Sequence, residues 1–223
     1  MALIDFMSEI HMSTHRDYLA RVNDLEMPKP RAAKLAKKWD YEYWDGDRRV
    51  CYGGYQYIPG RWVAVARAMS THYCLKPGDR VLDIGCGKGF QLADLKGEAP
   101  GISVYGLDIS EYAIRNSHEE TKKSSTIGCA SKLPFPDDYF DFVFSINTLH
   151  NLPNFMLFKA LQEIERVGKK NKYICVESYA TEEEKANLLY WQVTCETFFS
   201  PEEWHWFFDM AGYTGDYSFI FFN

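Results

Sequence analysis

Two acidic residues flank a glycine-rich turn in a way that suits the binding of a nucleotide. Asp83 lies in the apolar run Val81–Ile84, which leads into Gly85-Cys86-Gly87-Lys88-Gly89, and Asp108 closes the apolar run Val104–Leu107. A strand that ends in a glycine turn and continues as a helix lets the backbone approach a ligand closely. A carboxylate at the end of the next strand can accept hydrogen bonds from both ribose hydroxyls. A turn needed only for tight packing is the alternative interpretation.

The spacing of the glycines distinguishes between classes of nucleotide ligand. Dinucleotide-binding turns follow Gly-x-Gly-x-x-Gly, whereas Gly85, Gly87 and Gly89 follow Gly-x-Gly-x-Gly, with Asp83 two residues before the first. Together with Asp108 and the later segment 133–141 (Leu-Pro-Phe-Pro-Asp-Asp-Tyr-Phe-Asp), this pattern resembles the class I S-adenosylmethionine (SAM)-dependent methyltransferases over roughly residues 75–180. The resemblance implies SAM as the cofactor and says little about the acceptor.

The resemblance also implies which residues hold the cofactor. In the family, the position of Asp83 lies near the amino-acid part of SAM, and the backbone of Gly85, Cys86 and Gly87 passes beneath it. Asp108 would then bind the ribose hydroxyls. Ile109 would lie along one face of the adenine.

One position departs from the family pattern. The family commonly has Asp-Ala after the third strand, where the Asp accepts a hydrogen bond from the adenine amino group, and this chain has Cys129-Ala130. Because a thiol is a weak acceptor, we expect adenine recognition to rely on the backbone amide of Ala130 or to be weaker. A substitution that simply lowers the affinity for SAM is the other interpretation.

Polar residues at the ends of two later strands are candidates for contact with the acceptor. Asn147 and His150 follow the fourth predicted strand, and Glu177 ends the fifth. His150 could serve as a general base, since the ordinary pKa of histidine lies near neutral pH. Asn147 could position the acceptor or the amine of the cofactor, and Glu177 could bind an amine or hydroxyl. A core or capping role for His150 and a structural ion pair for Glu177 are the alternatives.

The aromatic segment, Trp39–Trp62, is predicted to form a lid. Seven of the residues that follow its first tryptophan are Tyr or Trp, and glycines and a proline divide the segment into turns. Tyr52 and Tyr55 could flank the cationic sulfonium, with Tyr52 close to the reacting methyl group, since aromatic faces attract cations. Arg61 could hold the methionine carboxylate in a bidentate contact. The alternative is a set of surface aromatics packed on the first helices.

The order of the elements predicts an α/β fold. Strands alternate with helices, which favours a doubly wound, mostly parallel sheet of six or seven strands with helices on both faces. The expected strands lie near 81–84, 103–107, 125–128, 142–146, 172–178 and 217–222, and the expected helices near 1–24, 32–39, 63–73, 89–96, 110–123, 154–167 and 201–211, with another beginning at 181. Ser110 and Thr181 are predicted N-caps. Residues 1–73 would form the helices and lid, and residues 74–223 the SAM-binding core, as one compact unit. The family usually adds two strands after its last helix, and only one is evident here.

Composition limits the other possibilities. A net charge of −6 over 223 residues argues against a nucleic-acid footprint, and no window is apolar enough for a membrane span. The six cysteines form no Cys-x-x-Cys pair, and we do not expect the first residues, which lack a basic start and a long apolar stretch, to act as a signal peptide. We therefore expect a cytoplasmic enzyme with reduced cysteines, no metal and a small-molecule partner, and the sequence leaves its oligomeric state open.

The sequence therefore predicts a methyltransferase of small-molecule biosynthesis. Because the methyl group of SAM is already activated, the protein mainly has to align the nucleophile and exclude water. Two alternatives remain open. An enzyme of the same fold could attack the aminobutyrate carbon of SAM and release methylthioadenosine, and a non-catalytic protein could simply bind SAM.

Overall fold

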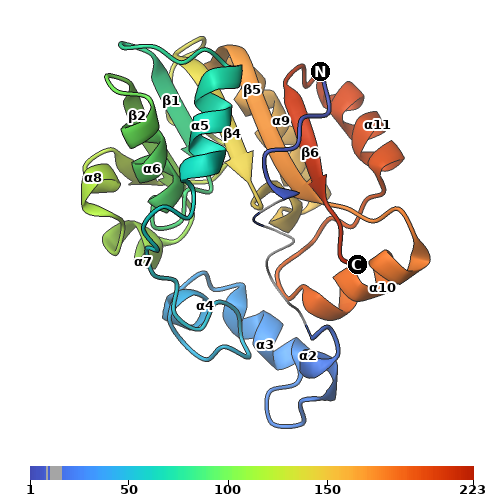
Figure 1. Cartoon of the computed structure of the whole chain (residues 1–223). Coiled ribbons are helices and arrows are strands. Elements are labelled where there is room, and N and C mark those ends of the chain that lie inside the picture. Colours follow the sequence, from blue (N-terminus) through green and yellow to red (C-terminus); the bar gives the residue numbers. More distant parts are fainter. Residues whose placement is uncertain (9, 11–16) are drawn as a thin grey trace.

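A computed structural model describes residues 1–8, 10 and 17–223 of the chain. Its centre is a six-stranded sheet in the order β3-β2-β1-β4-β5-β6, in which every neighbouring pair is parallel (Figure 1). The strands are β1 (Arg80–Ile84), β2 (Ser103–Asp108), β3 (Ser125–Ile127), β4 (Phe140–Ile146), β5 (Gly168–Glu177) and β6 (Asp216–Ile220). The predicted fold class is therefore confirmed, with a sheet that is parallel throughout.

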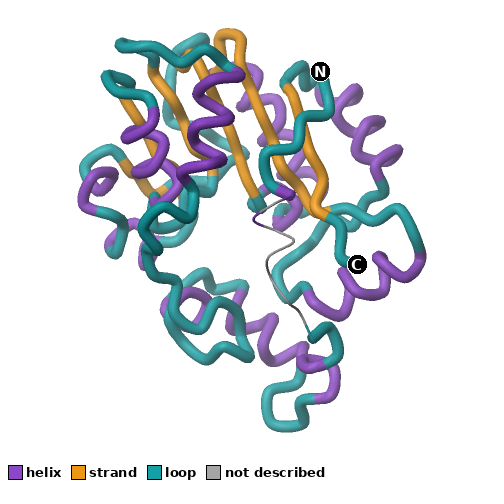
Figure 2. Tube along the Cα trace, in the orientation of Figure 1, coloured by secondary structure: helices purple, strands orange, loops and turns teal. Residues whose placement is uncertain are grey.

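Helices cover both faces of this sheet, as Figure 2 shows. Successive strand residues point to opposite faces, so Val81 joins the apolar layer beneath α5 and α6 while Leu82 joins the layer that holds α9 and α11. The helices are α2 (Ala20–Asn23), α3 (Lys29–Ala36), α4 (Tyr41–Trp44), α5 (Val63–His72), α6 (Phe90–Glu98), α7 (Glu111–Arg115), α8 (Glu119–Lys122), α9 (Asn154–Val167), α10 (Glu182–Trp191) and α11 (Pro201–Ala211), with a 3₁₀ turn at Leu149–Asn151.

The first residues of the chain differ from their prediction. The predicted helix over 1–24 is wrong for residues 1–7 and 17–19, which are not helical, whereas Ser8 and Ile10 are helical. Leu3 instead forms a parallel bridge with Tyr217 of β6. The amide of Ile4 donates to Tyr217 O at 2.9 Å, and the amide of Tyr217 donates to Ala2 O at 3.0 Å. An edge strand presents unpaired backbone groups that such a segment can satisfy. Residues 9 and 11–16 of the predicted helix lie outside the described residues.

The predicted helix 110–123 is two short helices. Ser110 caps the first as expected, since its Oγ accepts the amide hydrogen of Ala113 at 3.0 Å. The chain then breaks at His118, whose amide donates to Lys88 O at 2.8 Å instead of to the preceding turn. The glycine turn thus fixes the place where α7 ends and α8 begins. Thr181 is confirmed as the N-cap of α10, in a capping box with Glu184.

The reversal of strand order in the sheet determines where the ligand site lies. From β1 the chain proceeds to β2 and β3 on one side, and then returns to place β4, β5 and β6 on the other. Ligands of such sheets bind outside the carboxyl ends of the strands, at the point of reversal. Gly85 follows β1 and Asn147 follows β4 at this point, and α3 and α4 lie beyond the same edge in Figure 1.

Candidate functional site

A first cavity of about 380 Å³ opens at the carboxyl ends of β1, β2 and β4. Its walls come from the glycine turn, from the ends of these strands and from the aromatic segment. The lining residues include Trp39, Tyr43, Trp44, Tyr52, Tyr55, Trp62, Asp83, Gly85, Cys86, Gly87, Asp108, Ile109, Cys129, Ala130, Asn147, Thr148 and Asn151. The structure therefore brings together ten of the eleven residues predicted to bind the cofactor.

Two buried carboxylates give this cavity its electrostatic character. Asp83 is 4% exposed and Asp108 is 7% exposed, and neither has an ion-pair partner among the described residues. Burial raises the pKa of both carboxyl groups, and the negative charge of Asp108 raises that of Asp83 further. Asp108 accepts the amide hydrogens of Gly87 and Ser110, each at 2.8 Å. A cationic ligand would compensate these two charges.

The glycines allow other parts of the chain to close on the turn. Gly85 has φ +83°, and a Cβ there would lie 1.9 Å from Oγ1 of Thr148. Gly87 has φ +54°, and a Cβ there would lie 2.8 Å from the indole ring of Trp44. Both positions therefore need glycine, for the backbone conformation and for space. The aromatic segment rests directly on the glycine turn, so it forms one wall of the first cavity.

Two polar anchors hold the aromatic segment against this turn, and neither was predicted as part of the site. The buried hydroxyl of Ser110 accepts a hydrogen bond from Nε1 of Trp44 at 2.8 Å and donates to the backbone carbonyl of Trp39. Lys88 is 3% exposed, and its ammonium group donates to both carboxylate oxygens of Asp45 and to Tyr55 O. The sequence signal was a lysine between two glycines. Its burial, which makes a partner necessary, was not visible in the sequence.

A second cavity of about 400 Å³ adjoins the first. The residues that line both cavities are Tyr43, Tyr52, Tyr55, Trp62, Asn147, Asn151 and Thr194. Of the predicted residues, Arg61, His150 and Glu177 line only the second cavity. Arg61, the remaining predicted cofactor ligand, thus lies on the far side of the shared wall, and its contact with the methionine carboxylate stays a prediction.

His150 and Glu177 form a buried pair in the wall of the second cavity. The amide of Glu177 donates to Nδ1 of His150 at 3.4 Å, and Nε2 of His150 lies 3.3 Å from Oε2 of Glu177. These partners assign the proton of the neutral ring to Nε2. Burial lowers the pKa of His150 to about 3, so the ring is a weak base at neutral pH. A role in orienting Glu177 suits this ring better than proton abstraction.

Two asparagines mark the junction of the cavities. Asn147 has φ +55°, a conformation that costs energy for residues other than glycine but is tolerated by asparagine. Asn151 donates through Nδ2 to the backbone oxygens of Asn147 (3.3 Å) and Thr148 (3.1 Å), while its buried Oδ1 has no hydrogen-bond partner among the described residues. This oxygen is ready to accept a hydrogen bond from a ligand. Sequence reasoning missed Asn151, although it follows His150 directly.

Comparison with known proteins identifies the fold family. Residues 75–212, well over half of the chain, match the family described as "Methyltransferase domain". The chain belongs to this methyltransferase family. A solved structure of a SAM-dependent methyltransferase from Archaeoglobus fulgidus is 26% identical, with a TM-score of 0.54 over 67% of this chain and 68% of that one. SAM is accordingly the cofactor of this methyltransferase domain.

Curated relatives resemble part of the methyltransferase. Demethylmenaquinone methyltransferase from Staphylococcus carnosus is 36% identical over 47% of this chain and 45% of its own length. The 27-O-demethylrifamycin SV methyltransferase of Amycolatopsis mediterranei is 34% identical over 36% of this chain and 32% of its own. The chain thus spans about half of the first relative's length and less of the second.

The first cavity fits this cofactor. Its two carboxylates have no ion-pair partner among the described residues, so Asp83 is available to a cationic group of SAM and Asp108 to the ribose hydroxyls, and the glycine turn offers a close backbone surface. Among the described residues, no three His, Cys, Asp or Glu side chains are grouped so as to hold a metal ion. In the same part of the chain, no helix has both the length and the apolar character that crossing a membrane requires.

Proposed function

We propose that this protein transfers the methyl group of SAM to a small-molecule acceptor bound in the second cavity. The observation that carries the proposal is the shared wall: seven residues line both cavities, so a ligand in one would meet a ligand in the other. Both volumes lie within the range of small-molecule sites, about 300–1,000 Å³. The names of the two curated relatives, which refer to demethylated small molecules, support an acceptor of this kind.

The predicted residues would hold the cofactor in the following way. Asp83 would face its ammonium group and Asp108 its ribose hydroxyls, because both carboxylates line the first cavity without a cationic partner among the described residues. The remaining contacts would come from the backbone of Gly85, Cys86 and Gly87, from Ile109, Cys129 and Ala130 around the adenine, from Tyr55 beside the sulfonium, and from Arg61 at the carboxylate. SAM supplies an activated methyl group, so these residues need only fix its position.

The acceptor would be aligned by residues of the shared wall. Asn147 and Asn151 present their side chains at the end of β4, and Tyr52 presents its ring from the aromatic segment. The unpaired Oδ1 of Asn151 would accept a hydrogen bond from the nucleophilic hydroxyl or amine of the acceptor, or from the ammonium group of SAM. His150 would hold Glu177 in place in the wall of the second cavity. Correct alignment of reacting groups alone can supply about 7–11 kcal/mol of the barrier reduction.

A product assay tests the proposal. The protein is incubated with SAM, alone and with a metabolite extract of the source organism, and the adenosine products are separated by mass spectrometry. We expect S-adenosylhomocysteine to form only when extract is present, together with an acceptor that has gained one CH₂ group. Methylthioadenosine formed without an acceptor would instead show attack on the aminobutyrate carbon. Tight SAM binding without either product would show a binding protein.

A further inference from the structure

The two adjoining cavities carry charges of opposite sign. Among the described residues, the first cavity is lined by the carboxylates of Asp83, Asp108 and Glu196 against a single cation, Lys37, which is ion-paired to Glu196. Within the same described part of the chain, the second cavity is lined by three arginines and one carboxylate, Glu177. Because the chain as a whole has a net charge of −6, this concentration of positive charge is a local feature. It indicates a ligand of opposite charge in the second cavity.

Arg21 provides the most informative of these charges. It is 8% exposed, yet no described carboxylate lies within ion-pair distance of it. Its Nη1 donates to Trp191 O at 2.5 Å and its Nε to Arg49 O at 3.3 Å, while its guanidinium carbon lies 4.7 Å from the centre of the Trp191 ring. A guanidinium has five N–H donors, and two of those of Arg21 have protein acceptors in the described chain. A buried arginine with donors to spare at a cavity wall is suited to bind an anion.

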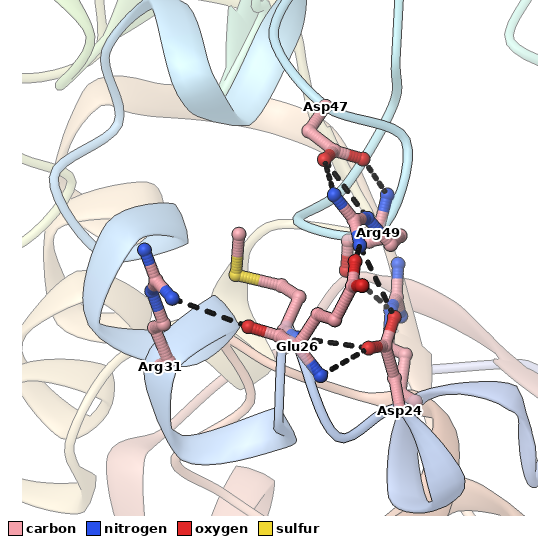
Figure 3. Close-up of polar contacts among 7 residues, drawn as sticks. Asp24, Glu26, Arg31, Asp47 and Arg49 are labelled. Carbon is pink, nitrogen blue, oxygen red and sulfur yellow. Dashed lines mark hydrogen bonds and ion pairs between the residues drawn. The ribbon is translucent and has the colours of Figure 1, made fainter.

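Arg48 and Arg49 are neighbours with contrasting surroundings. Arg49 bonds to Asp47 at 2.7 Å and to Glu26 at 3.1 Å, and lies 3.8 Å from Asp24, as Figure 3 shows. Arg48 lines the second cavity, donates to the backbone carbonyl of Cys51, and has no described carboxylate within ion-pair distance. Acidic residues are therefore present next to this segment, and they neutralise Arg49 rather than Arg48.

The proximity of Arg21 and Arg48 strengthens the case for an anionic ligand. Burial lowers the pKa of Arg21, and the positive charge of Arg48 lowers it further. Two like charges at one wall repel each other unless an anion lies between them. The carboxylate of Glu177 is already engaged, because it accepts a hydrogen bond from Gln192 and lies beside His150. The rest of the wall is largely apolar and aromatic, with Trp62, Phe90 and Phe222 among its members.

We propose that the acceptor is an acid with an apolar or aromatic body, whose carboxylate or phosphate group is bound by Arg21 and Arg48. The proposal rests on the proposed function, since it assigns the acceptor to the second cavity. The third arginine of this cavity, Arg61, is assigned to the carboxylate of SAM and not to the acceptor. The apolar body would lie along the aromatic wall, and the acceptor atom would reach the shared residues Asn147 and Asn151. Both arginines are then specificity-determining residues that fix the distance between the anionic group and the atom methylated.

The test divides the possible acceptors by charge. A metabolite extract is separated at pH 8 on an anion-exchange column, and formation of S-adenosylhomocysteine from SAM is measured with the retained fraction and with the flow-through. A portion of the retained fraction is treated with a phosphatase, which removes phosphate esters and leaves carboxylates intact. Variants Arg21→Gln and Arg48→Gln are compared with Arg31→Gln, an exposed arginine that does not line either cavity and bonds to the backbone of Glu26.

The expected result is turnover with the retained fraction alone. Each cavity variant should raise the KM for that fraction by about tenfold or more, since a hydrogen bond to a charged group contributes roughly 1.5–3 kcal/mol, and the KM for SAM should stay unchanged. Arg31→Gln should behave like the unmodified protein. If Arg21→Gln does not fold, Arg48→Gln alone decides the test, because Arg48 is exposed and its replacement should not disturb folding. Loss of turnover after phosphatase treatment identifies a phosphate, and retained turnover identifies a carboxylate.

Other outcomes separate the two proposals. Turnover with the flow-through would overturn the anionic acceptor while leaving methyl transfer to a small molecule intact. Turnover with the retained fraction that neither arginine variant changes would also overturn it. No product from either fraction, with SAM binding preserved, would overturn the proposed function itself.

Discussion

The ammonium group of Lys88 lies 2.7 Å from Oδ2 of Asp45 and joins the glycine turn to the aromatic segment. The side chain of Lys88 is 4% exposed and that of Asp45 is 17% exposed, so the pair is largely shielded from water. Asp45 also accepts hydrogen bonds from the hydroxyl of Tyr112 and the amide of Tyr55. One cluster thus connects the turn beneath the first cavity with the wall above it.

Removing the lysine of this pair should destabilise the protein. Lys88→Met leaves a largely buried carboxylate without its cation, which costs about 3–5 kcal/mol and lowers Tm by on the order of 10 °C. The KM for SAM should also rise, because the wall loses its anchor. Thermal denaturation and initial rates measure both effects. Lys96→Met, which breaks an exposed pair with Glu120, should leave Tm almost unchanged, and equal losses in the two variants would contradict the role of the buried pair.

Asp83 should make the SAM-free protein less stable as the pH rises. Its pKa is raised by burial and by Asp108, so the protonated state stabilises the fold below the unfolded pKa of about 3.9, and this contribution is lost as the pH rises through the folded pKa. Asp83→Asn should therefore raise Tm at pH 8, with the difference shrinking toward pH 4, while SAM binding weakens. Melting curves at the two pH values and calorimetry with SAM check this. A variant that is less stable at both pH values would show that the carboxylate is needed for folding.

Asp108 should determine affinity for SAM. Asp108→Ala removes the carboxylate assigned to the ribose hydroxyls and the acceptor for the amides of Gly87 and Ser110, so we expect calorimetry to show no measurable binding of SAM. Asp209→Ala, on an exposed position of α11, is the matched control and should bind SAM normally. Retained affinity in Asp108→Ala would disprove the ribose assignment.

Tyr52 should matter more for turnover than for stability. Tyr52 is 39% exposed, its ring stacks on that of Trp44 with 5.5 Å between the ring centres, and it lines both cavities. Tyr52→Ala should lower kcat/KM by about tenfold or more, equal to at least about 1.4 kcal/mol, with a Tm change of a few degrees at most. Tyr52→Phe keeps the ring and should retain most activity. A large loss of Tm with proportionate loss of activity would make Tyr52 a packing residue instead.

Arg61 provides a test of the one proposed cofactor contact that comes from outside the first cavity, because among the two cavities it lines only the second. If it holds the carboxylate of SAM, Arg61→Gln should raise the KM for SAM by about tenfold and leave the KM for the acceptor unchanged. Initial rates with each substrate varied in turn give both constants. The reverse pattern would assign Arg61 to the acceptor together with Arg21 and Arg48.

The elements that the sequence predicted well are those bounded by local signals. The predicted bounds of α9 and α11 agree with the structure because Pro153 and Gly168 flank the first, and Ser200 and Gly212 flank the second. Strand and glycine-turn positions follow from the same kind of local pattern. The first cavity was therefore foreseen through the glycine turn and Asp108, which lie within one continuous stretch of the core.

The features that were missed depend on contacts between distant parts of the chain. Nothing near Arg21 in the sequence shows that its guanidinium bonds to the backbone of Trp191, 170 residues later. The pairing of Asp45 with Lys88 likewise joins residues 43 positions apart. The low pKa of His150 results from burial by several elements. Charge sign and residue type were visible in each case, whereas the partner and the degree of burial were not.

The pairing of the first residues with β6 has a consequence for synthesis of the chain. The amide of Ala2 donates to Oδ1 of Asp216, a residue 214 positions later. At about 5–20 residues per second, the ribosome needs roughly 10–40 s to make the residues between them. Throughout that interval the segment 2–4 has no native strand to pair with, so the last edge of the sheet closes only after translation has passed Tyr217.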